Sequence, residues 1–440
     1  WAVEAFADYG AENVESTFRS CYAGEEEHGS VRLPRSAGGK GRREADEANK
    51  PAEVEAIEAF LFSQAEFRHN VITHHCEIRW TEEAGFLPLT DRDVNTLWGR
   101  MNKTVGRVYL TDIYNVIHSE FVPLFNPFQS YFDHLPSWDG VSDPIGDLAD
   151  TVHVKSDQAE FRDYFRKWFV GILPALLDDT VVNHEILVLI GEQGLYKTTW
   201  FNFLLPPELR CYFYTKTNSD RLNKDDLFSL TEFALICFEE LDGMRPAELN
   251  QLKAMVTMPY VNERAAYGRN KERHPHIASF CGTGNNVQFL TDPTGNRRWL
   301  PFEVSQIRDP HLHAIPYELV YSQAYALWKS GFCHWFSQEE IRKLNMHNSR
   351  FEVPNLEEDL IRTHFRKPFE GEAGIFVTAA DILEQISSCL RYPLSPNKIG
   401  RIMAGLEFES IRYKGKRGYI TVKKTGEDID RERRSGALGL

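Results

Sequence analysis

A glycine-containing loop with a lysine and a threonine follows an apolar run in the middle of the chain. The run spans residues 185–190 (EILVLI), and the sequence GEQGLYKTT comes directly after it. Such a run predicts a strand buried on both faces. Gly191 and Gly194 would let the backbone turn its amide N–H groups toward a triphosphate, and a helix starting near Lys197 would add the positive end of its dipole. The spacing therefore predicts a phosphate-binding loop.

The side chains of this loop suit ATP and Mg²⁺. Lys197 would reach the β and γ phosphates, Thr198 would hold Mg²⁺ through its hydroxyl, and Thr199 would complete the nucleotide contacts. The usual pattern has glycine immediately before the lysine, but Tyr196 stands there. We expect a side chain to fit at Tyr196 if φ is negative or the loop follows a different path, and ATP affinity to suffer more than the fold. The alternative is a strand-to-helix turn that binds no nucleotide.

Paired carboxylates follow a second apolar run. Residues 233–238 (FALICF) end in Glu239 and Glu240, which resembles a Walker B strand with Glu in place of the usual Asp. Strand alternation predicts that the two side chains point to opposite faces, one toward Mg²⁺ and the other toward the attacking water. Glu239 is the candidate metal ligand, although the sequence does not decide which carboxylate is the base. A solvated acidic turn is the alternative.

A third run, residues 277–281 (IASFC), ends in GTGNN, and the sequence GNRRW follows it. The amide of Asn285 could orient the hydrolytic water, the role called sensor 1. Arg297 and Arg298 follow a Gly-Asn turn, and the planar, permanently charged guanidinium suits a phosphoryl transition state. We therefore predict an arginine finger, an arginine that contacts ATP bound to a neighbouring subunit. The alternative is a surface salt bridge.

Cations alternate with aromatic residues between the second and third runs, over residues 260–274 (YVNERAAYGRNKERH). Such a mixture suits a strand of phosphates and stacked bases. The predicted DNA-contacting residues are Arg264, Arg269, Lys271 and Arg273. A solvated loop and a subunit interface are the alternatives.

Residues 371–424 carry nine Lys or Arg against five Asp or Glu, in a chain whose net charge is −14. Thr378 and the Ser395-Pro396 pair are start signals for two short helices, and strands flank the turn of residues 414–418. This order predicts a helix-turn-helix with a β wing that binds DNA. The predicted contacts are Lys398 and Arg401 in a groove and Lys414, Lys416 and Arg417 on phosphates. Docking to a protein is the alternative.

The rest of the chain must position these groups. A helix is predicted from Ile57, Phe60 and Leu61, a strand over residues 70–73, and a helix through residues 109–117. Trp138 is expected to anchor the core. The predicted organisation is a linker or remnant of an upstream domain (1–53), a mainly helical domain (54–180), a P-loop ATPase domain (181–335), a helical connector (336–370), a winged-helix-like domain (371–424) and a polar tail (425–440).

Composition limits the class of protein. Hydrophobic residues make up 42% of the 440, and no apolar run is long enough to span a membrane. Seven scattered cysteines without a CxxC pair favour a reducing cytoplasm. The chain starts at Trp1 without a signal peptide, so we expect a piece of a longer protein. Because the chain is acidic overall, DNA contacts are expected to be local.

The order GEQGLYKTTW, EELD, GTGNN and GNRRWLPFEV resembles the virulence-associated E family, which lies near the superfamily 3 helicases of phages, plasmids and small DNA viruses. The resemblance covers roughly residues 60 to 305. It implies an α/β fold with an AAA-like P-loop NTPase core, often assembled as a homo-oligomeric ring. Such a protein binds single-stranded or forked DNA and unwinds or remodels DNA during replication of a mobile element, often beside a primase. It also implies Walker A roles for Lys197 and Thr198, Walker B roles for Glu239 and Glu240, sensor 1 for Asn285, and the finger for Arg297 or Arg298.

Two other functions remain open from the sequence. A non-hydrolysing replication or packaging adaptor would bind DNA through the C-terminal module and keep a degenerate loop for structure, and Tyr196 favours it. A small-molecule P-loop kinase fits the loop but leaves GNRRW and the basic stretch without a role. ATP hydrolysis with and without single-stranded DNA separates the three.

Overall fold

The computed structural model describes residues 52–81, 85–217, 224–263, 272–291, 296–353, 356–369, 371–387, 395–426 and 428. The linker and tail predicted at the two ends lie almost wholly outside these residues. Two compact units are present. The first comprises the described residues up to Arg68 and Cys76–Pro123, and the second comprises His69–His75 and the described residues from Leu124 onward. None of the described helices combines the length and apolar composition needed to cross a bilayer.

The first unit combines helices with a small sheet, and more of its residues lie in the helices than in the strands. Its elements are α3 (Val54–Gln64), β1 (Ala65–Asn70), β2 (His75–Trp80), β3 (Leu87–Pro88), α4 (Asp91–Thr104) and α5 (Leu110–Ile117). The sheet order is β3-β2-β1-β4, where β4 (Leu124–Phe125) pairs with His69 and Asn70, which belong with it to the second unit. Ile57 and Leu61 of α3 and Ile113 of α5 are buried in one apolar cluster, so the predicted helices at 57–61 and 109–117 are confirmed.

The strand predicted over residues 70–73 is wrong. Strand β1 ends at Asn70, whose Oδ1 accepts hydrogen bonds from the backbone N–H groups of Ile72 (3.0 Å) and Thr73 (3.2 Å). A side chain that binds the backbone two and three residues ahead favours a turn over a continuing ladder. The Nδ2 of Asn70 also donates to Tyr212 Oη at 2.8 Å. The β-branched residues after Asn70 therefore form a turn and not a strand, because the Asn70 side chain binds their backbone and is itself held by Tyr212.

A six-stranded sheet forms the core of the second unit, in the order β5-β12-β6-β11-β8-β7. Its strands are β5 (Val152–Val154), β6 (Ile186–Ile190), β7 (Phe213–Lys216), β8 (Leu235–Phe238), β11 (Ser279–Gly284) and β12 (Trp299–Ile307). All neighbours are parallel except β5 and β12. Gly284 pairs with Ile190 and Gly282 with Phe238, so the polar loops after β6, β11 and β8 share one edge of the sheet.

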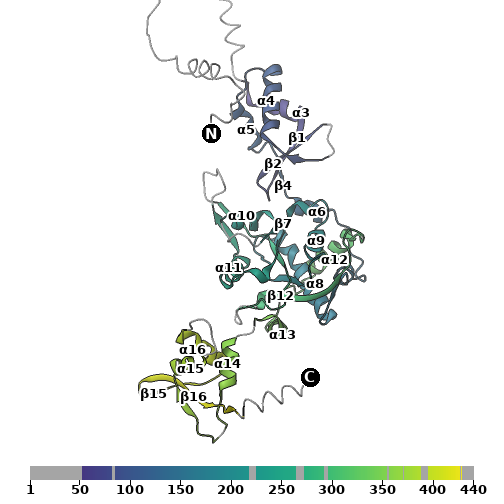
Figure 1. Cartoon of the computed structure of the whole chain (residues 1–440). Helices are drawn as coiled ribbons and strands as arrows, with labels where there is room; N and C mark the ends of the chain where they lie inside the picture. Colours follow the sequence, from purple (N-terminus) through teal and green to yellow (C-terminus); the bar gives the residue numbers. More distant parts are fainter. Residues whose placement is uncertain are drawn as a thin grey trace, which may run out of the picture. The chain divides into compact units, whose positions relative to one another are not determined.

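Helices cover both faces of this sheet (Figure 1). Alternate residues of β6 divide between two apolar clusters, Leu187 and Leu189 in one, Ile186 and Val188 in the other. The first cluster includes residues of α8 (Gln158–Leu177), α9 (Lys197–Leu204) and α12 (Tyr317–Lys329), and the second includes residues of α10 (Lys224–Glu232) and α11 (Pro246–Val256). The sheet is therefore the middle layer of an α/β/α sandwich, as the apolar run 185–190 predicts.

The remaining elements connect and extend this sandwich. They are α6 (Pro127–Asp133), α7 (Pro144–Ala149), η1 (Arg210–Tyr212), η2 (Leu241–Gly243), β9 (Tyr260–Glu263), β10 (Glu272–Pro275), η3 (Asn296–Arg298), α13 (Gln338–Asn348) and η4 (Ser349–Phe351).

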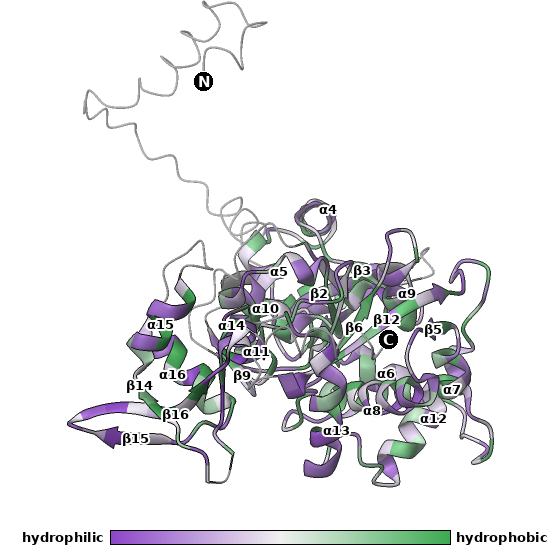
Figure 2. Cartoon of the chain, turned by 60° about the horizontal axis from the view of Figure 1, so that its bottom comes forward, coloured by the Kyte–Doolittle hydropathy of each residue, from purple (hydrophilic) through white to green (hydrophobic). Residues whose placement is uncertain are grey.

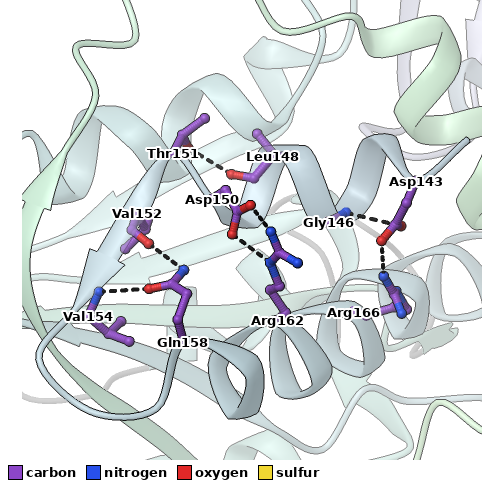
Figure 3. Close-up of polar contacts among 10 residues, drawn as sticks. All are labelled: Asp143, Gly146, Leu148, Asp150, Thr151, Val152, Val154, Gln158, Arg162 and Arg166. Carbon is purple, nitrogen blue, oxygen red and sulfur yellow. Dashed lines mark hydrogen bonds and ion pairs between the residues drawn. The ribbon is translucent and has the colours of Figure 1, made fainter.

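Polar contacts fix the segment that leads into α8 (Figure 3). Arg162 donates to Asp150, with 2.6 Å between Nε and Oδ1, and Gln158 bonds the backbone of both Val152 and Val154. The hydroxyl of Thr151 accepts a hydrogen bond from Trp200 Nε1 at 2.8 Å. Since Trp200 is a buried residue of α9, this segment fixes the helix that follows the glycine-containing loop.

Trp138 is not the core anchor that its residue type suggests. It is only partly buried, and its Nε1 donates to the carbonyl of Ser142, four residues away. Trp168, Trp200 and Trp299 are instead fully buried. Each of these three belongs to an element of the sandwich, whereas Trp138 lies in an irregular loop where a local turn supplies its partner.

The C-terminal module consists of short helices and strands. They are α14 (Leu356–His364), β13 (Phe365–Arg366), β14 (Ile375–Val377), α15 (Ala379–Ser387), α16 (Pro396–Gly405), β15 (Ser410–Tyr413) and β16 (Lys416–Lys423). Thr378 and Asp381 form the expected capping pair, and Ser395 Oγ accepts from Lys398 N. The strands are joined by a two-residue turn in which Lys414 and Gly415 both have positive φ, of 46° and 76°. Figure 2 shows the β15–β16 hairpin as largely hydrophilic.

Candidate active site

The loop between β6 and α9 makes a tight turn at the carboxyl edge of the sheet. Gly194 has a φ of 85°, and the N–H of Gly191 donates to the carbonyl of Gly284 at 3.1 Å. A Cβ on Gly191 would lie 2.9 Å from the carbonyl oxygen of Val304, so this position has no room for a side chain. The predicted strand, loop and helix are all present. Gly194 provides the positive φ of the turn, and Gly191 provides the space for the close approach to Val304.

Tyr196 departs from the expectation for its backbone. It adopts the left-handed conformation, with φ 58° and ψ 19°, and its side chain is 42% exposed. Of the two ways in which we expected a side chain to fit here, negative φ is wrong, because Tyr196 adopts the left-handed backbone that glycine usually provides. This conformation costs a non-glycine residue about 1–2 kcal/mol, so the loop carries local strain.

The ammonium of Lys197 lies inside the loop. Its Nζ donates to the carbonyls of Gly191 (2.6 Å) and Glu192 (2.7 Å) and lies 3.4 Å from Asn285 Oδ1. Only 8% of the residue is exposed. Burial lowers the pKa of the Lys197 ammonium, and the carboxylate of Asp242 partly offsets this effect. The charge is therefore held at the centre of the site before any ligand binds.

The carboxylates after β8 line the same pocket as this loop. Thr198 Oγ1 donates to Glu239 Oε1 at 2.9 Å, which joins the first helical turn of α9 to the end of β8. Glu240 has a φ of 53° and is exposed. The strand alternation on which the opposite-face prediction for Glu239 and Glu240 rests does not extend to them, because β8 ends at Phe238 and Glu240 adopts a left-handed turn, and both residues line one pocket.

Asp242, which we did not single out from the sequence, joins the second and third strand ends. Its Oδ1 accepts from the N–H of Asn285 (3.1 Å) and its Oδ2 from the N–H of Asn286 (3.0 Å). Gly284 leaves the space for this contact, since a Cβ there would lie 3.0 Å from Asp242 Oδ1. The sequence signal that could have identified Asp242 is its position as the last acidic residue of EELD. Its partners could not be predicted, because they lie 43 and 44 residues away in the chain.

These groups enclose a polar pocket of about 350 Å³. Its lining residues are Gln193, Gly194, Leu195, Tyr196, Lys197, Thr198, Thr199, Glu239, Glu240, Thr283, Gly284 and Asn285. We call it the strand-end pocket. The structure thus brings the three predicted motifs together, although β11 and not β8 is the direct neighbour of β6.

Arg297 and Arg298 lie away from this pocket. They end η3 (Asn296–Arg298), which we call the arginine turn, and the next residue, Trp299, pairs with Ile186 at the start of β6. Five strand residues, roughly 16 Å, separate that edge from the glycine-containing loop. Arg297 is exposed, whereas Arg298 is partly buried. Burial and the neighbouring Arg297 lower the pKa of Arg298. Neither side chain can reach the pocket of its own chain.

Strands β9 and β10 form an antiparallel hairpin in the basic stretch. The guanidinium of Arg273 lies 3.5 Å from the centre of the Tyr260 ring, so one predicted cation does stack on an aromatic residue. Arg264, Arg269 and Lys271 lie outside the described residues.

The basic residues of the C-terminal module divide into two groups. Lys398 forms an ion pair with the buried carboxylate of Glu357 while its own side chain remains partly exposed, so its charge already has an intramolecular partner. The described cations that are exposed on α16 and the hairpin are Arg401, Arg412, Lys414, Lys416, Arg417 and Lys423. Arg412 was not predicted, and it lies directly opposite Arg417 in the β15–β16 ladder. Like charges in that position repel each other, which favours an anionic ligand on this hairpin.

Known proteins place the chain in a family. Residues 133–353 match the virulence-associated protein E-like domain. No curated protein matches the chain. Among solved structures, the apo structure of the NrS-1 C terminal region (305-718) has a TM-score of 0.45 and 12% identity, covering 84% of this chain and 99% of that one. The A form apo structure of the same region has a TM-score of 0.44, with the same identity and coverage. With half of its length matched by the family model, the chain belongs to the virulence-associated protein E-like domain family.

Proposed function

We propose that this chain is an ATP-dependent DNA helicase or translocase that acts in replication of a mobile genetic element. The observation that supports this most strongly is the strand-end pocket, where a buried ammonium, a hydroxyl–carboxylate pair and a fixed amide converge from three strand ends. Phosphoryl transfer depends mainly on such positioning and on charge stabilisation.

The pocket fits ATP with Mg²⁺. Thr198 Oγ1 and Glu239 Oε1 lie 2.9 Å apart, and hard oxygen ligands of this kind suit Mg²⁺. When bound, Mg²⁺ would neutralise charge on the β and γ phosphates. Lys197 would exchange its bonds to loop carbonyls for bonds to those phosphates. The N–H groups of the loop and the start of α9 would hold the phosphate oxygens.

Glu240 and Asn285 are the candidates for the hydrolytic water. Because Glu239 bonds Thr198, we assign Glu239 to the metal and Glu240, exposed at the pocket wall, to the general base. Asn285 would orient the water, while Asp242 holds the backbone of Asn285 in place.

The arginine turn would act on a neighbouring subunit. Arg297 is exposed and lies at the opposite edge of the sheet from its own strand-end pocket. A finger supplied in trans requires this separation in a ring of identical chains, where each interface joins one pocket to the next subunit's arginine turn. We propose Arg297 as the finger because Arg298 is partly buried.

DNA would contact two basic regions. The β9–β10 hairpin would meet single-stranded DNA, and the helices and β15–β16 hairpin of residues 371–424 would act as a winged helix. The proposed domains are those given by the sequence, 54–180, 181–335, 336–370 and 371–424. A primase, in the same protein or as a partner, would provide the replication context.

The left-handed, strained backbone of Tyr196 favours a second candidate function. In this alternative the chain is a DNA-binding adaptor that does not hydrolyse ATP. ATP turnover by the full chain separates the two. We expect hydrolysis that single-stranded DNA stimulates, together with ATP-dependent unwinding of a forked duplex. Binding of DNA without any ATP hydrolysis would support the adaptor and overturn the proposal.

A further inference from the structure

A buried asparagine brackets the two arginines of the arginine turn. Asn348, the last residue of α13, is fully buried. Its Nδ2 donates to the carbonyl of Asn296 at 2.8 Å and to the carbonyl of Trp299 at 3.0 Å. These carbonyls lie immediately before and after Arg297-Arg298. One amide group therefore fixes both ends of the segment that carries the arginines.

A second bond fixes the first residue of the turn. Asn296 is 2% exposed, and its Nδ2 donates to Glu352 Oε1 at 2.8 Å. Glu352 follows η4, which continues directly from α13. The end of α13 and the residues after it thus hold the arginine turn from two directions, while Asn348 is not one of the residues that line the strand-end pocket.

The end of α13 is itself tied to the sandwich. The imidazole of His347 lies 2.7 Å from the carbonyl of Pro301 through Nε2 and 2.9 Å from Glu160 Oε2 through Nδ1. Pro301 belongs to β12 and Glu160 to α8. Asn348 therefore presents its amide from a rigid base, as the support of a functional group requires.

We propose that Asn348 is a positioning residue that orients Arg297 toward the nucleotide bound to a neighbouring subunit. This inference rests on the proposed function, because it assumes hydrolysis with a finger in trans. Arg297 is exposed, and the backbone of the turn fixes the position of its Cα and the direction of its Cα–Cβ bond. A misplacement of about 1 Å can cost roughly 100-fold in rate, so loosening this backbone is expected to affect turnover without altering the neighbouring subunit's own pocket.

Mixed assemblies provide the test. Lys197→Ala inactivates the strand-end pocket of its subunit but leaves the arginine turn intact. Arg297→Ala removes the proposed finger but leaves the pocket intact. Asn348→Ala is expected to lower ATP turnover about 10- to 100-fold with ATP affinity unchanged. Mixing it with Lys197→Ala should restore turnover, whereas mixing it with Arg297→Ala should not. Asn345→Ala is the matched control, since Asn345 is an exposed asparagine one turn earlier on α13, and it should retain wild-type turnover.

Asn348→Asp and Glu352→Ala provide independent variants if Asn348→Ala does not fold, and both should show the same pattern of complementation. The inference is overturned if the folded variants keep wild-type turnover, or if Lys197→Ala fails to restore them although it restores Arg297→Ala. If Lys197→Ala and Arg297→Ala restore nothing together although they associate, the finger in trans is wrong and the inference falls with it.

Discussion

The strand-end pocket and the β15–β16 hairpin hold their charged groups in different ways. At the pocket, the ammonium of Lys197 and the hydroxyl of Thr198 donate to intramolecular partners at 2.6 and 2.9 Å, and the carboxylate of Asp242 behind it accepts from the N–H of Asn285 at 3.1 Å. On the hairpin, the cations are exposed, and Arg412 lies opposite Arg417. The pocket is organised before a ligand binds, which suits chemistry. The hairpin presents like charges that repel each other. This suits binding of a polyanion, whose affinity depends on the number of cations presented to it. Replacing a single group in the pocket should therefore lower ATP turnover strongly. On the hairpin, DNA affinity should depend instead on how many positive charges remain.

The largest effect should come from the two carboxylates. Glu240→Gln should lower ATP turnover by about 10²- to 10⁴-fold, because it removes the proposed general base, while ATP binding persists. Glu239→Gln should instead weaken the site for Mg²⁺, so its turnover should recover partly as Mg²⁺ is raised. Turnover and fluorescent-nucleotide binding across a Mg²⁺ titration distinguish the two. Wild-type turnover in both variants would show that neither carboxylate takes part.

Charge number is tested on the hairpin. Replacing Lys414, Lys416 and Arg417 with Ala should weaken DNA binding without nucleotide and reduce the slope of log affinity against log salt by roughly one unit per lost phosphate contact. The control replaces three exposed lysines elsewhere, Lys103, Lys329 and Lys343, which matches the change in net charge. An unchanged slope in the hairpin variant would indicate a protein-docking module.

A buried histidine beside the β9–β10 hairpin should make the core sensitive to acid. His276 is 1% exposed, its Nδ1 lies 2.6 Å from the carbonyl of Met258, and burial lowers its pKa to about 4. Because the unfolded chain binds this proton at a higher pH than the folded chain, stability should fall as pH drops from about 6.5 toward 4.

The expected contribution of His276 between pH 8 and pH 5 is about 2 kcal/mol. His276→Asn keeps a donor for Met258 but does not titrate in this range. Denaturant unfolding of the two proteins at both pH values measures the difference, and an equal loss of stability in both would exclude His276 as the cause.

The smallest effect concerns strain in the loop. Tyr196→Gly should raise the free energy of unfolding by about 0.5–1 kcal/mol, because relief of the left-handed strain exceeds the entropy that glycine adds to the unfolded chain. Tyr196→Ala keeps a Cβ and thus the strain, so it should not be stabilised. Equal stability of the two variants would show that the Tyr196 backbone is unstrained.

Local chemistry made much of the fold predictable from sequence. The apolar run of residues 185–190 predicted a buried strand from composition, although the strand's ladder partners in β11 and β12 lie far away in the chain. The capping pair at Thr378 and Asp381 and the Ser395 cap depend on neighbours in the chain, and both are present. Their interactions span at most a few residues, so composition and spacing are sufficient to predict them.

Partners far apart in the chain explain what the sequence did not predict. The position of β11 between β6 and β8, the bonds of Asp242 to the loop after β11, and the pairing of Lys398 with Glu357 41 residues away all depend on tertiary packing. The same holds for Asn348, whose partners lie 52 and 49 residues away. Residue types placed the candidate site on the strand ends, but packing determined which groups meet.

The most direct test of the central claim is ATP hydrolysis by the wild-type chain and by Lys197→Ala, measured beside their unfolding curves. Removing one preorganised donor commonly costs about 10²- to 10³-fold in rate. Loss of turnover on that scale, with a cooperative unfolding transition preserved in Lys197→Ala, is the predicted result. Equal turnover in the two proteins would contradict the assignment of the strand-end pocket as an ATPase site.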